Sequence, residues 1–352
     1  MKEHDLRSTP ITIVGAGAIG GTVGAFLTEA GYDVTLVDIV PEHVQIMNER
    51  GLRITGLRGD RTFPVKAVLA SELRGPLGAT FLCVKGHFTE AAIQQIGPLL
   101  APDGFVLSLQ NGLNEEIIAR YVGPERTVGA FVHFGADYLE PGLILLGSEQ
   151  TIFPGELDGA ITPRLRAIQT TLSHVMPAKM TTNIWGFLWG KLVYGAMAFV
   201  VSTVDAPVPE IIDNPLGMLL SRTASEEAFA VAKSQVDHLE RIGEFDPNAF
   251  APGDDFAARS EAVLNELADG MRASIKQQMG IWRDLKVKKR KTEVDMQTAV
   301  IVARGAERCI PTPVNAAVLQ VIHEIEDGTR GMDWSNLDDI ARIAGVERAS
   351  AQ

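Results

Sequence analysis

The stretch Ile11–Asp38 reads ITIVGAGAIGGTVGAFLTEAGYDVTLVD, with several glycines between two apolar runs. The runs at Ile11–Val14 and at residues 33–38 have the composition of buried parallel strands. Residues 21–31 between them have the pattern of a helix that Gly31 closes at its C-terminus. The stretch therefore predicts a strand, a helix and a second strand.

Three of the glycines form the pattern G-x-G-x-x-G at the first turn from strand to helix. The first glycine permits a tight turn, the second lets a pyrophosphate approach the backbone, and the third lets the helix pack closely on the strand. The helix N-terminus adds free N–H groups and the positive end of its dipole. We therefore predict a dinucleotide site rather than a tight turn without a ligand. The residues expected to bind the cofactor here are Gly15, Ala16, Gly17, Ala18, Ile19 and Gly20.

Asp38 ends the second predicted strand and bears on the choice of dinucleotide. A carboxylate at this place accepts hydrogen bonds from the hydroxyls of the adenosine ribose and repels a 2′-phosphate. The sequence that follows, IVPEH at residues 39–43, has no arginine to receive such a phosphate. The sequence therefore favours NAD(H) over NADP(H), with a solvated residue at a strand end as the alternative reading of Asp38.

The composition limits the classes of partner. The chain has 352 residues, 46% of them hydrophobic, which is enough to build the cores of two domains. Its 32 basic and 44 acidic residues give a net charge of -12, which argues against binding to nucleic acid or to an anionic membrane. The apolar run Leu192–Val204 is too short to span a bilayer and predicts a buried helix.

The N-terminus and the cysteines indicate the compartment. Residues 1–10 are charged and polar, without the apolar segment of a secretory signal. Cys83 and Cys309 lie in apolar contexts without the spacing of metal ligands, which predicts buried thiols rather than a disulfide, a nucleophile or a metal site. We therefore expect a cytoplasmic protein.

The α/β pattern continues beyond the first unit of strands and helix. Further predicted elements are strands at residues 65–70, 79–85 and 105–112, a helix at 89–100, and a strand and turn within 127–144. Lys85 and Asn111 fall at the carboxyl ends of two of these strands, where ligands gather in open α/β sheets. Each is a candidate site residue, with an ordinary polar loop residue as the alternative.

From about residue 181 the pattern changes to long helices. These are predicted at residues 183–204, 215–235, 256–280, 291–308 and 313–328. The sequence thus predicts an α/β fold in two domains, a Rossmann-type dinucleotide-binding domain at 1–180 and an all-helical domain at 181–352. Residues 242–255 are rich in Pro, Gly and Asp and predict a loop able to cover a cleft.

Two charged residues stand out in the helical part. Lys191 interrupts an otherwise apolar helix, and burying its charge is costly unless it reaches a cleft or a partner. The alternative is a lysine whose stem packs while its ammonium stays in water. Glu293 lies beside the basic run Lys286–Lys291, which we interpret as a solvated face.

Several motifs in this order resemble the ketopantoate reductase (2-dehydropantoate 2-reductase) family, and the resemblance spans nearly the whole chain. They are GAGAIGG, GLRITGLRG, CVKG, LQNGLNEE, WGKL and RKTEVD. The resemblance implies a Rossmann domain followed by a helical domain like that of 6-phosphogluconate dehydrogenases, with the active site between them. It also implies a homodimer that acts on a small 2-oxo or 2-hydroxy acid. The roles it implies are Lys191 as general acid and substrate ligand, Asn111 and Lys85 at the nicotinamide and substrate end, Glu293 at the cofactor ribose or substrate, and Ala136 against the cofactor.

The chain departs from the family at the substrate positions. In the family, asparagines one and two turns after the catalytic lysine hold the substrate, whereas Gly195 and Phe199 stand there in this chain. A serine expected before WRDL is replaced by Gly280. Family members also usually prefer NADP, with a basic residue near the position of Asp38. These departures predict that the chemistry is retained and that the substrate differs.

Three functions remain open at this stage. The first is a reductase that transfers hydride from a nicotinamide cofactor to a 2-oxo acid related to ketopantoate, with Lys191 supplying the proton and a positive charge. The second is an NAD-dependent dehydrogenase of the same build that oxidises a hydroxy acid. The third is a dinucleotide-sensing protein without catalysis. A screen of 2-oxo and 2-hydroxy acids with both cofactors separates them.

Overall fold

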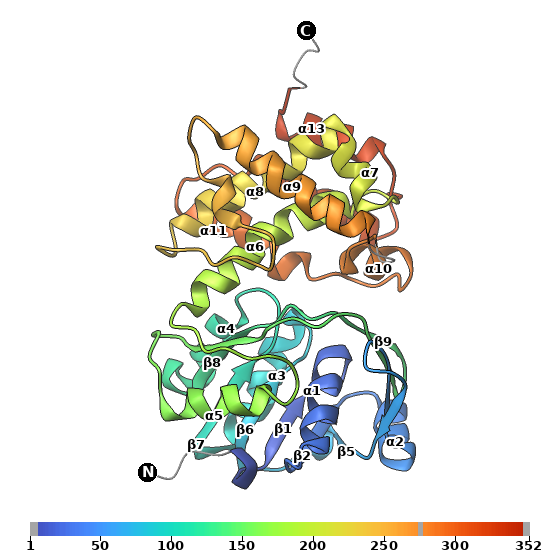
Figure 1. Ribbon diagram of the computed structural model, residues 1–352, viewed down its shortest axis with the longest axis vertical. Helices are drawn as coiled ribbons and strands as arrows, with labels where there is room; N and C mark the ends of the chain where they lie inside the picture. The colour runs from blue at the N-terminus through green and yellow to red at the C-terminus, as the bar shows by residue number, and fades with distance from the viewer. Residues whose placement is uncertain (1–5, 274–276, 348–352) are drawn as a thin grey trace. The chain divides into compact units, whose positions relative to one another are not determined.

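The computed structural model describes residues 6–273 and 277–347 (Figure 1). The chain divides into two compact units, Met1–Ile184 and Trp185–Gln352. The first unit combines a parallel sheet with helices, and the described part of the second is built of helices. This confirms the predicted fold class.

The main sheet of the first unit forms from the apolar strands that the sequence predicts. All four residues of β1 are buried, and β1 pairs in parallel with β2 on one side and β6 on the other. The sheet order is β11-β8-β7-β6-β1-β2-β5, with β11 antiparallel to β8. The strands are β1 Ile11–Val14, β2 Val34–Asp38, β5 Lys66–Leu69, β6 Leu77–Leu82, β7 Leu100–Ser108, β8 Thr127–Phe131 and β11 Phe153–Glu156.

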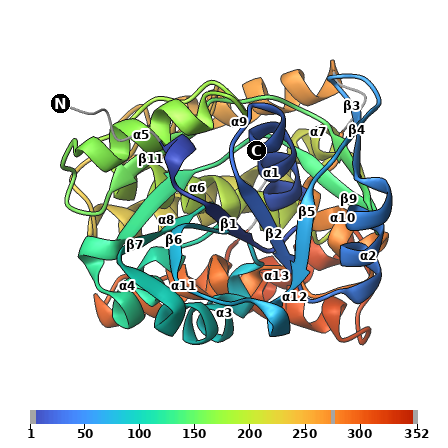
Figure 2. The ribbon, with the colours of Figure 1, turned by 90° about the horizontal axis from the view of Figure 1, so that it is seen from below.

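Helices cover both faces of this sheet, which explains why its central strands are apolar throughout. Figure 2 shows α1 and α5 on one face and α3 and α4 on the other, and the two hydrophobic clusters divide the helices in the same way. Ile13 packs in the first cluster and its neighbour Val14 in the second, since side chains alternate along a strand. The helices of this unit are α1 Ala18–Glu29, α2 Pro41–Arg50, α3 Thr89–Ile96, α4 Asn114–Val122 and α5 Pro163–Leu172.

A second, four-stranded sheet in this unit was not predicted. Its order is β4-β3-β10-β9, formed by β3 Leu52–Gly56, β4 Arg61–Phe63, β9 Ala136–Glu140 and β10 Leu143–Leu146. Three of the strands, β3, β4 and β9, are short and carry exposed residues, so they lack the continuous apolar runs that mark the main sheet. The segment expected to hold one strand and a turn therefore contains β8, β9 and part of β10.

The second unit is organised around α6, the apolar helix expected to be buried. By length and composition this helix is the one candidate membrane span among the described residues, yet 83% of it is buried inside the structure, as befits a core helix. Figure 1 shows it among the other helices of the unit. They are α6 Ile184–Val201, α7 Val208–Asp213, α8 Pro215–Lys233, α9 Phe256–Arg272, α10 Gly280–Lys286, α11 Thr298–Glu307, α12 Pro313–Glu326 and α13 Ser335–Ala344.

The helix predicted at residues 291–308 begins later than expected, at Thr298. The segment before it is held in another conformation because Thr292 donates from both its N–H and its hydroxyl to Glu326 Oε1, at 2.7 and 2.6 Å. A short 3₁₀ turn at Val294–Met296 then leads into α11. The helix predicted at 256–280 ends at Arg272, and residues 274–276 lie outside the described part.

The loop expected to cover a cleft is anchored to the helical unit. Phe245 and Phe250 in this loop are buried and stack on each other with ring centroids 5.5 Å apart. Tyr194 of α6 meets the Phe245 ring edge to face. Residues 242–255 are therefore fixed by aromatic packing rather than placed as an open lid.

The two cysteines are free, and neither is the fully buried thiol expected, since Cys83 is only partly buried. Burial raises the pKa of the Cys83 thiol well above its usual range. Cys309 is exposed, because it lies at the end of α11 in a left-handed conformation with φ of 56°.

Candidate active site

Four predicted site residues lie along one edge of the main sheet. Gly15 follows β1, Asp38 ends β2, and Lys85 and Asn111 come after β6 and β7. Because these four strands are parallel neighbours, their carboxyl ends share one edge, in the order Asn111, Lys85, Gly15, Asp38. Adjacent strands lie about 4.8 Å apart, so this row spans roughly 14 Å. A row of this length can contact a small molecule that binds in an extended conformation.

Neither Lys85 nor Asn111 ends a strand as expected, since β7 stops at Ser108. β6 stops at Leu82, and Lys85 precedes a short 3₁₀ turn at Gly86–Phe88, whose Phe88 N–H donates to the Lys85 carbonyl. One more hydrogen bond follows Leu82 along the β1 ladder, from the Cys83 N–H to the carbonyl of Val14 at the glycine-rich loop.

Each glycine of the fingerprint occupies a position with a distinct steric reason. Gly15 has φ of 96°, and a Cβ there would lie 2.7 Å from Val84 N. A Cβ on Gly20 would collide with the carbonyl oxygen of Gly15. A Cβ on Gly17, in contrast, would meet nothing within 4 Å, which leaves open space beside the first turn of α1. The N–H groups of that turn have no partner within the helix.

Asp38 organises the glycine-rich loop. Its Oδ2 accepts a hydrogen bond from Ala16 N–H at 2.9 Å. Its Oδ1 accepts from the N–H groups of Ile39 and Val40 at 2.8 and 3.0 Å. The carboxylate is therefore fixed by three backbone donors, which rules out a merely solvated residue at a strand end.

His43 is a second residue that holds the loop, and the sequence analysis missed it. This side chain of α2 is 1% exposed, and its Nε2 lies 2.9 Å from the carbonyl oxygen of Ala16. Its Nδ1 accepts from Gly142 N–H at 2.9 Å. A ring nitrogen that accepts carries no proton, so the proton sits on Nε2 and donates to Ala16. His43 therefore ties the glycine-rich loop to the turn between β9 and β10.

The same hairpin carries Ala136 and Tyr138. Ala136 begins β9, is partly buried and packs against the main core of the unit. The Tyr138 ring meets His43 edge to face, with centroids 5.1 Å apart. Burial, with the negative charges of Asp38 and Glu42, raises the pKa of Tyr138 to about 12. The Asp38 end of the row is thus an acidic environment.

A buried network fixes the opposite end of the row. Gln110 Nε2 donates to the carbonyl of Val84 and to Thr89 Oγ1, both at 2.7 Å. Thr89 donates onward to Asn114 Oδ1, and Asn114 Nδ2 donates to the carbonyl of Asn111 at 2.6 Å. The segments that carry Lys85 and Asn111 are therefore locked to each other.

The helical unit contributes the remaining candidates. Lys191 is the one charged residue of α6 and is partly exposed. Glu293 is buried, 7% exposed, on the segment that Thr292 pins to α12. Phe199, two turns after Lys191, has no exposed surface, so α6 presents no polar group at that turn. Gly280 begins α10, where an added Cβ would meet nothing within 4 Å.

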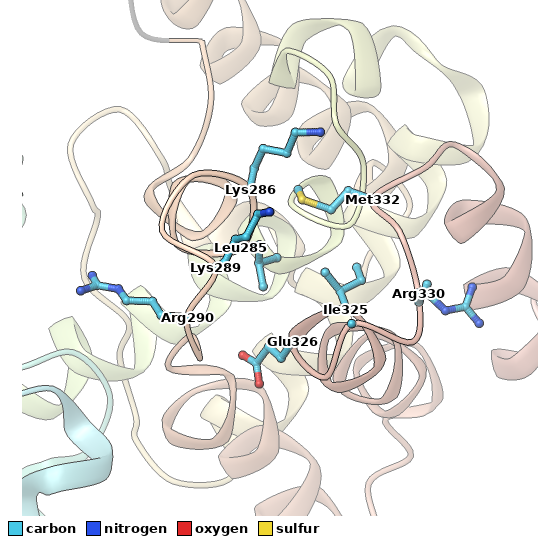
Figure 3. A pocket seen from close by; sticks show the side chains of 9 residues that line it. Leu285, Lys286, Lys289, Arg290, Ile325, Glu326, Arg330 and Met332 are labelled. Atoms are coloured by element: carbon cyan, nitrogen blue, oxygen red, sulfur yellow. The ribbon is translucent and has the colours of Figure 1, made fainter.

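A separate pocket of about 400 Å³ lies in the helical unit and contains none of the predicted site residues (Figure 3). Its lining comprises Leu285, Lys286, Lys289, Arg290, Ile325, Glu326, Gly328, Arg330 and Met332. Three of its four basic side chains are already in ion pairs: Lys286 with Asp205, Arg290 with Asp284, and Arg330 with Glu324 and Asp339. The pocket therefore has little uncompensated positive charge for an anion.

Comparison with known proteins agrees with the layout of both units. The profile described as "Ketopantoate reductase PanE/ApbA" matches residues 11–159, and "Ketopantoate reductase PanE/ApbA C terminal" matches residues 183–326. The 2-dehydropantoate 2-reductase of Archaeoglobus fulgidus is 29% identical over 327 residues, which cover 92% of this chain and 100% of that protein. The corresponding enzyme of Mesorhizobium japonicum is 25% identical over 341 residues, 90% of this chain and 97% of that protein.

Solved structures share the fold. A ketopantoate reductase of the PanE/ApbA family from Ralstonia eutropha JMP134 is 25% identical with a TM-score of 0.76, over 91% of this chain and 99% of that one. D-mandelate dehydrogenase, solved with NADH and anilino(oxo)acetate, is 24% identical with a TM-score of 0.79, over 91% of this chain and 98% of that one.

The His43 bridge generates a first prediction. His43→Phe keeps an aromatic ring against Tyr138 but removes both hydrogen bonds, so the Ala16 carbonyl loses its anchor. We expect the Kd for NADH to rise by about tenfold, measured by fluorescence titration. His174→Phe is the matched control, because His174 is an exposed histidine of the same unit. An unchanged Kd in folded His43→Phe protein would show that the bridge does not shape the dinucleotide loop.

Proposed function

Because the chain belongs to the ketopantoate reductase family of NAD(P)-dependent oxidoreductases, we propose that it reduces the C2 carbonyl of a 2-oxo acid to a 2-hydroxy acid. The observation that carries this proposal is the row of site residues along the carboxyl edge of the main sheet. An open glycine at the N-terminus of α1, with Asp38 at the end of the next strand, fits the pyrophosphate and ribose of a dinucleotide.

The residues of the first unit hold and orient the cofactor in this proposal. The residues at Gly15–Gly20 receive the pyrophosphate, and Asp38 receives the adenosine ribose. Lys85, Asn111 and Ala136 lie at the nicotinamide end. When bound, the reduced nicotinamide supplies the hydride. The locked Gln110 and Asn114 network keeps this end of the row preorganised, which is where positional precision matters most for reactivity.

Lys191 supplies the proton in this proposal. As the carbonyl oxygen gains negative charge, the ammonium of Lys191 stabilises it and gives it a proton from Nζ. The surrounding apolar residues of α6 strengthen this effect, because charges interact more strongly where water is excluded. Glu293, fixed by the Thr292 anchor, is proposed to contact the cofactor ribose or the substrate.

The substrate is proposed to be more apolar or bulkier than ketopantoate. Positions 195 and 199 lie on the face of α6 that carries Lys191, because residues four apart are neighbours on a helix. Gly195 has no side chain and Phe199 is apolar and buried. Each missing hydrogen bond to the substrate is worth about 1–3 kcal/mol.

A screen of 2-oxo acids with NADH and with NADPH tests the function directly. We expect turnover of an apolar or aromatic 2-oxo acid, with kcat/KM for ketopantoate lower by at least about tenfold. Ketopantoate turnover at about 10⁶ M⁻¹s⁻¹ or above would contradict the proposed substrate class. An absence of turnover with every 2-oxo acid would contradict the function itself.

NADH is the proposed cofactor, because Asp38 and the acidic surroundings of Tyr138 disfavour a 2′-phosphate. Asp38→Ser removes this repulsion, so we expect the ratio of the Kd for NADPH to the Kd for NADH to fall by about tenfold. The substitution also frees the Ala16 N–H, but this loosening weakens both dinucleotides alike. Parallel titrations therefore isolate the charge effect in the ratio. Tenfold tighter binding of NADPH than NADH by the parent protein would refute the preference.

The role of Lys191 is tested with Lys191→Met, which keeps the apolar stem and removes the ammonium. We expect kcat to fall by about 10² to 10⁴-fold while the Kd for NADH stays unchanged. Lys233→Ala, which removes an exposed lysine of the same unit, is the control. The measurements are steady-state kinetics, with thermal melting to show that the variant is folded. If folded Lys191→Met keeps a kcat within a few-fold of the parent, Lys191 is not the proton donor.

The cellular setting is proposed to be the cytoplasm, with the protein acting as a homodimer. Two free cysteines, one of them exposed, are typical of a reducing compartment.

A further inference from the structure

The side chain of Gln297 lies at the place on α6 where a residue other than glycine at position 195 would project. A Cβ added to Gly195 would lie 2.9 Å from Gln297 Oε1, closer than real Cβ atoms approach a neighbour without a shift. Gly195 therefore leaves the space that the Gln297 side chain fills. The contact lies wholly within the helical unit.

This place is next to Lys191. Position 195 is one turn after Lys191, and the Cβ atoms of such a pair are about 5–6 Å apart on the helix surface. Lys191 and Gln297 are both partly exposed, and the rest of α6 is apolar. Gln297 thus brings an amide to the turn of α6 that follows the one carrying Lys191.

The amide of Gln297 is available to a ligand. Among residues 6–273 and 277–347 its side chain has no hydrogen-bond partner in the protein. With Oε1 directed at Gly195, the other arm of the amide, Nε2, carries two N–H donors. A neutral donor beside Lys191 adds a hydrogen bond without adding a second charge.

The segment that carries Gln297 is held in place by α12. Thr292 donates twice to Glu326, and His323 Nε2 lies 2.9 Å from Asp295 Oδ1. Gln297 then precedes the first residue of α11, and its carbonyl accepts from Ile301 N–H. The position of Gln297 is therefore fixed by backbone and side-chain contacts before and after it in the sequence. The same short segment contains Glu293.

From this geometry we infer that Gln297 is a substrate-binding residue that binds the carboxylate of the 2-oxo acid while Lys191 faces the adjacent C2 oxygen. This inference rests on the proposed function and names the group that recognises the acid. The carboxylate and the C2 oxygen of a 2-oxo acid are on neighbouring carbons, so two donors from adjacent turns suit them. The carboxylate keeps its charge during reduction, so the hydrogen bond stabilises substrate and transition state alike.

The test compares Gln297→Ala with the parent protein and with Gln320→Ala, an exposed glutamine of α12 in the same unit. We expect KM for the best 2-oxo acid to rise by about 10- to 100-fold with kcat within a few-fold of the parent, which is the signature of a lost contact common to both states. The Kd for NADH stays the same. The rise in Tm that oxamate, a 2-oxo acid analogue, produces in the presence of NADH shrinks in parallel.

A double variant tests whether an amide supplied from another residue restores substrate binding. Gly195→Asn combined with Gln297→Ala places an amide in the same space from α6 itself, because the atom that a Cβ would meet is gone. We expect KM to return to within about tenfold of the parent. A merely structural glutamine predicts no such rescue.

The outcomes separate the two proposals. Two outcomes overturn the role of Gln297 and leave the proposed function standing. In the first, the parent turns over substrate and Gln297→Ala has an unchanged KM. In the second, Gln297→Ala loses Tm and kcat, and the double variant does not restore them. An absence of turnover and of oxamate stabilisation in the parent overturns the proposed function and this role with it.

Discussion

The close approach of two backbone segments at the first turn is the constraint on which the rest of the first unit depends. The carbonyl of Gly15 lies where a Cβ on Gly20 would be, and Gly15 itself lies against the backbone of Val84. Side chains at these places would push α1 away from β1 and β1 away from the end of β6. The seating of α1, the open space at Gly17 and the alignment of the strand ends all follow from this contact.

Local pattern was sufficient to predict the elements that this constraint governs. The strand, helix and strand at Ile11–Asp38 are visible because two apolar runs flank a glycine spacing that has a steric reason at each position. The second sheet was missed because β3, β4 and β9 are short and partly exposed, and the pairing of β3 with β10 joins two segments far apart in sequence. Burial alternates along β3, as in a strand with one buried face. Five alternating residues between a helix and a turn are too few to predict a strand.

The candidate site shows the same division. Asp38, Lys85 and Asn111 were predicted because the carboxyl ends of parallel strands converge, which depends on topology alone. His43 was not, because its ring contacts Ala16 across 27 positions and Gly142 across 99, distances that no local pattern reports. Gln297 was placed inside a predicted helix, and only the anchoring of Thr292 by Glu326 explains why the helix begins after it.

The separation of Gln297 from α6 bears on how such an enzyme diversifies. Side chains within α6 are almost all buried, so exchanging one of them for a new specificity disturbs the packing of neighbouring helices. A residue on the short segment before α11 is partly exposed and is held by its backbone neighbours rather than by its own side chain. With glycine at position 195, the proposed hydrogen bond to the carboxylate comes from a position that can mutate with little cost to folding. The same helical scaffold can then change how it holds the acid group by changes in a peripheral segment while its lysine stays in place.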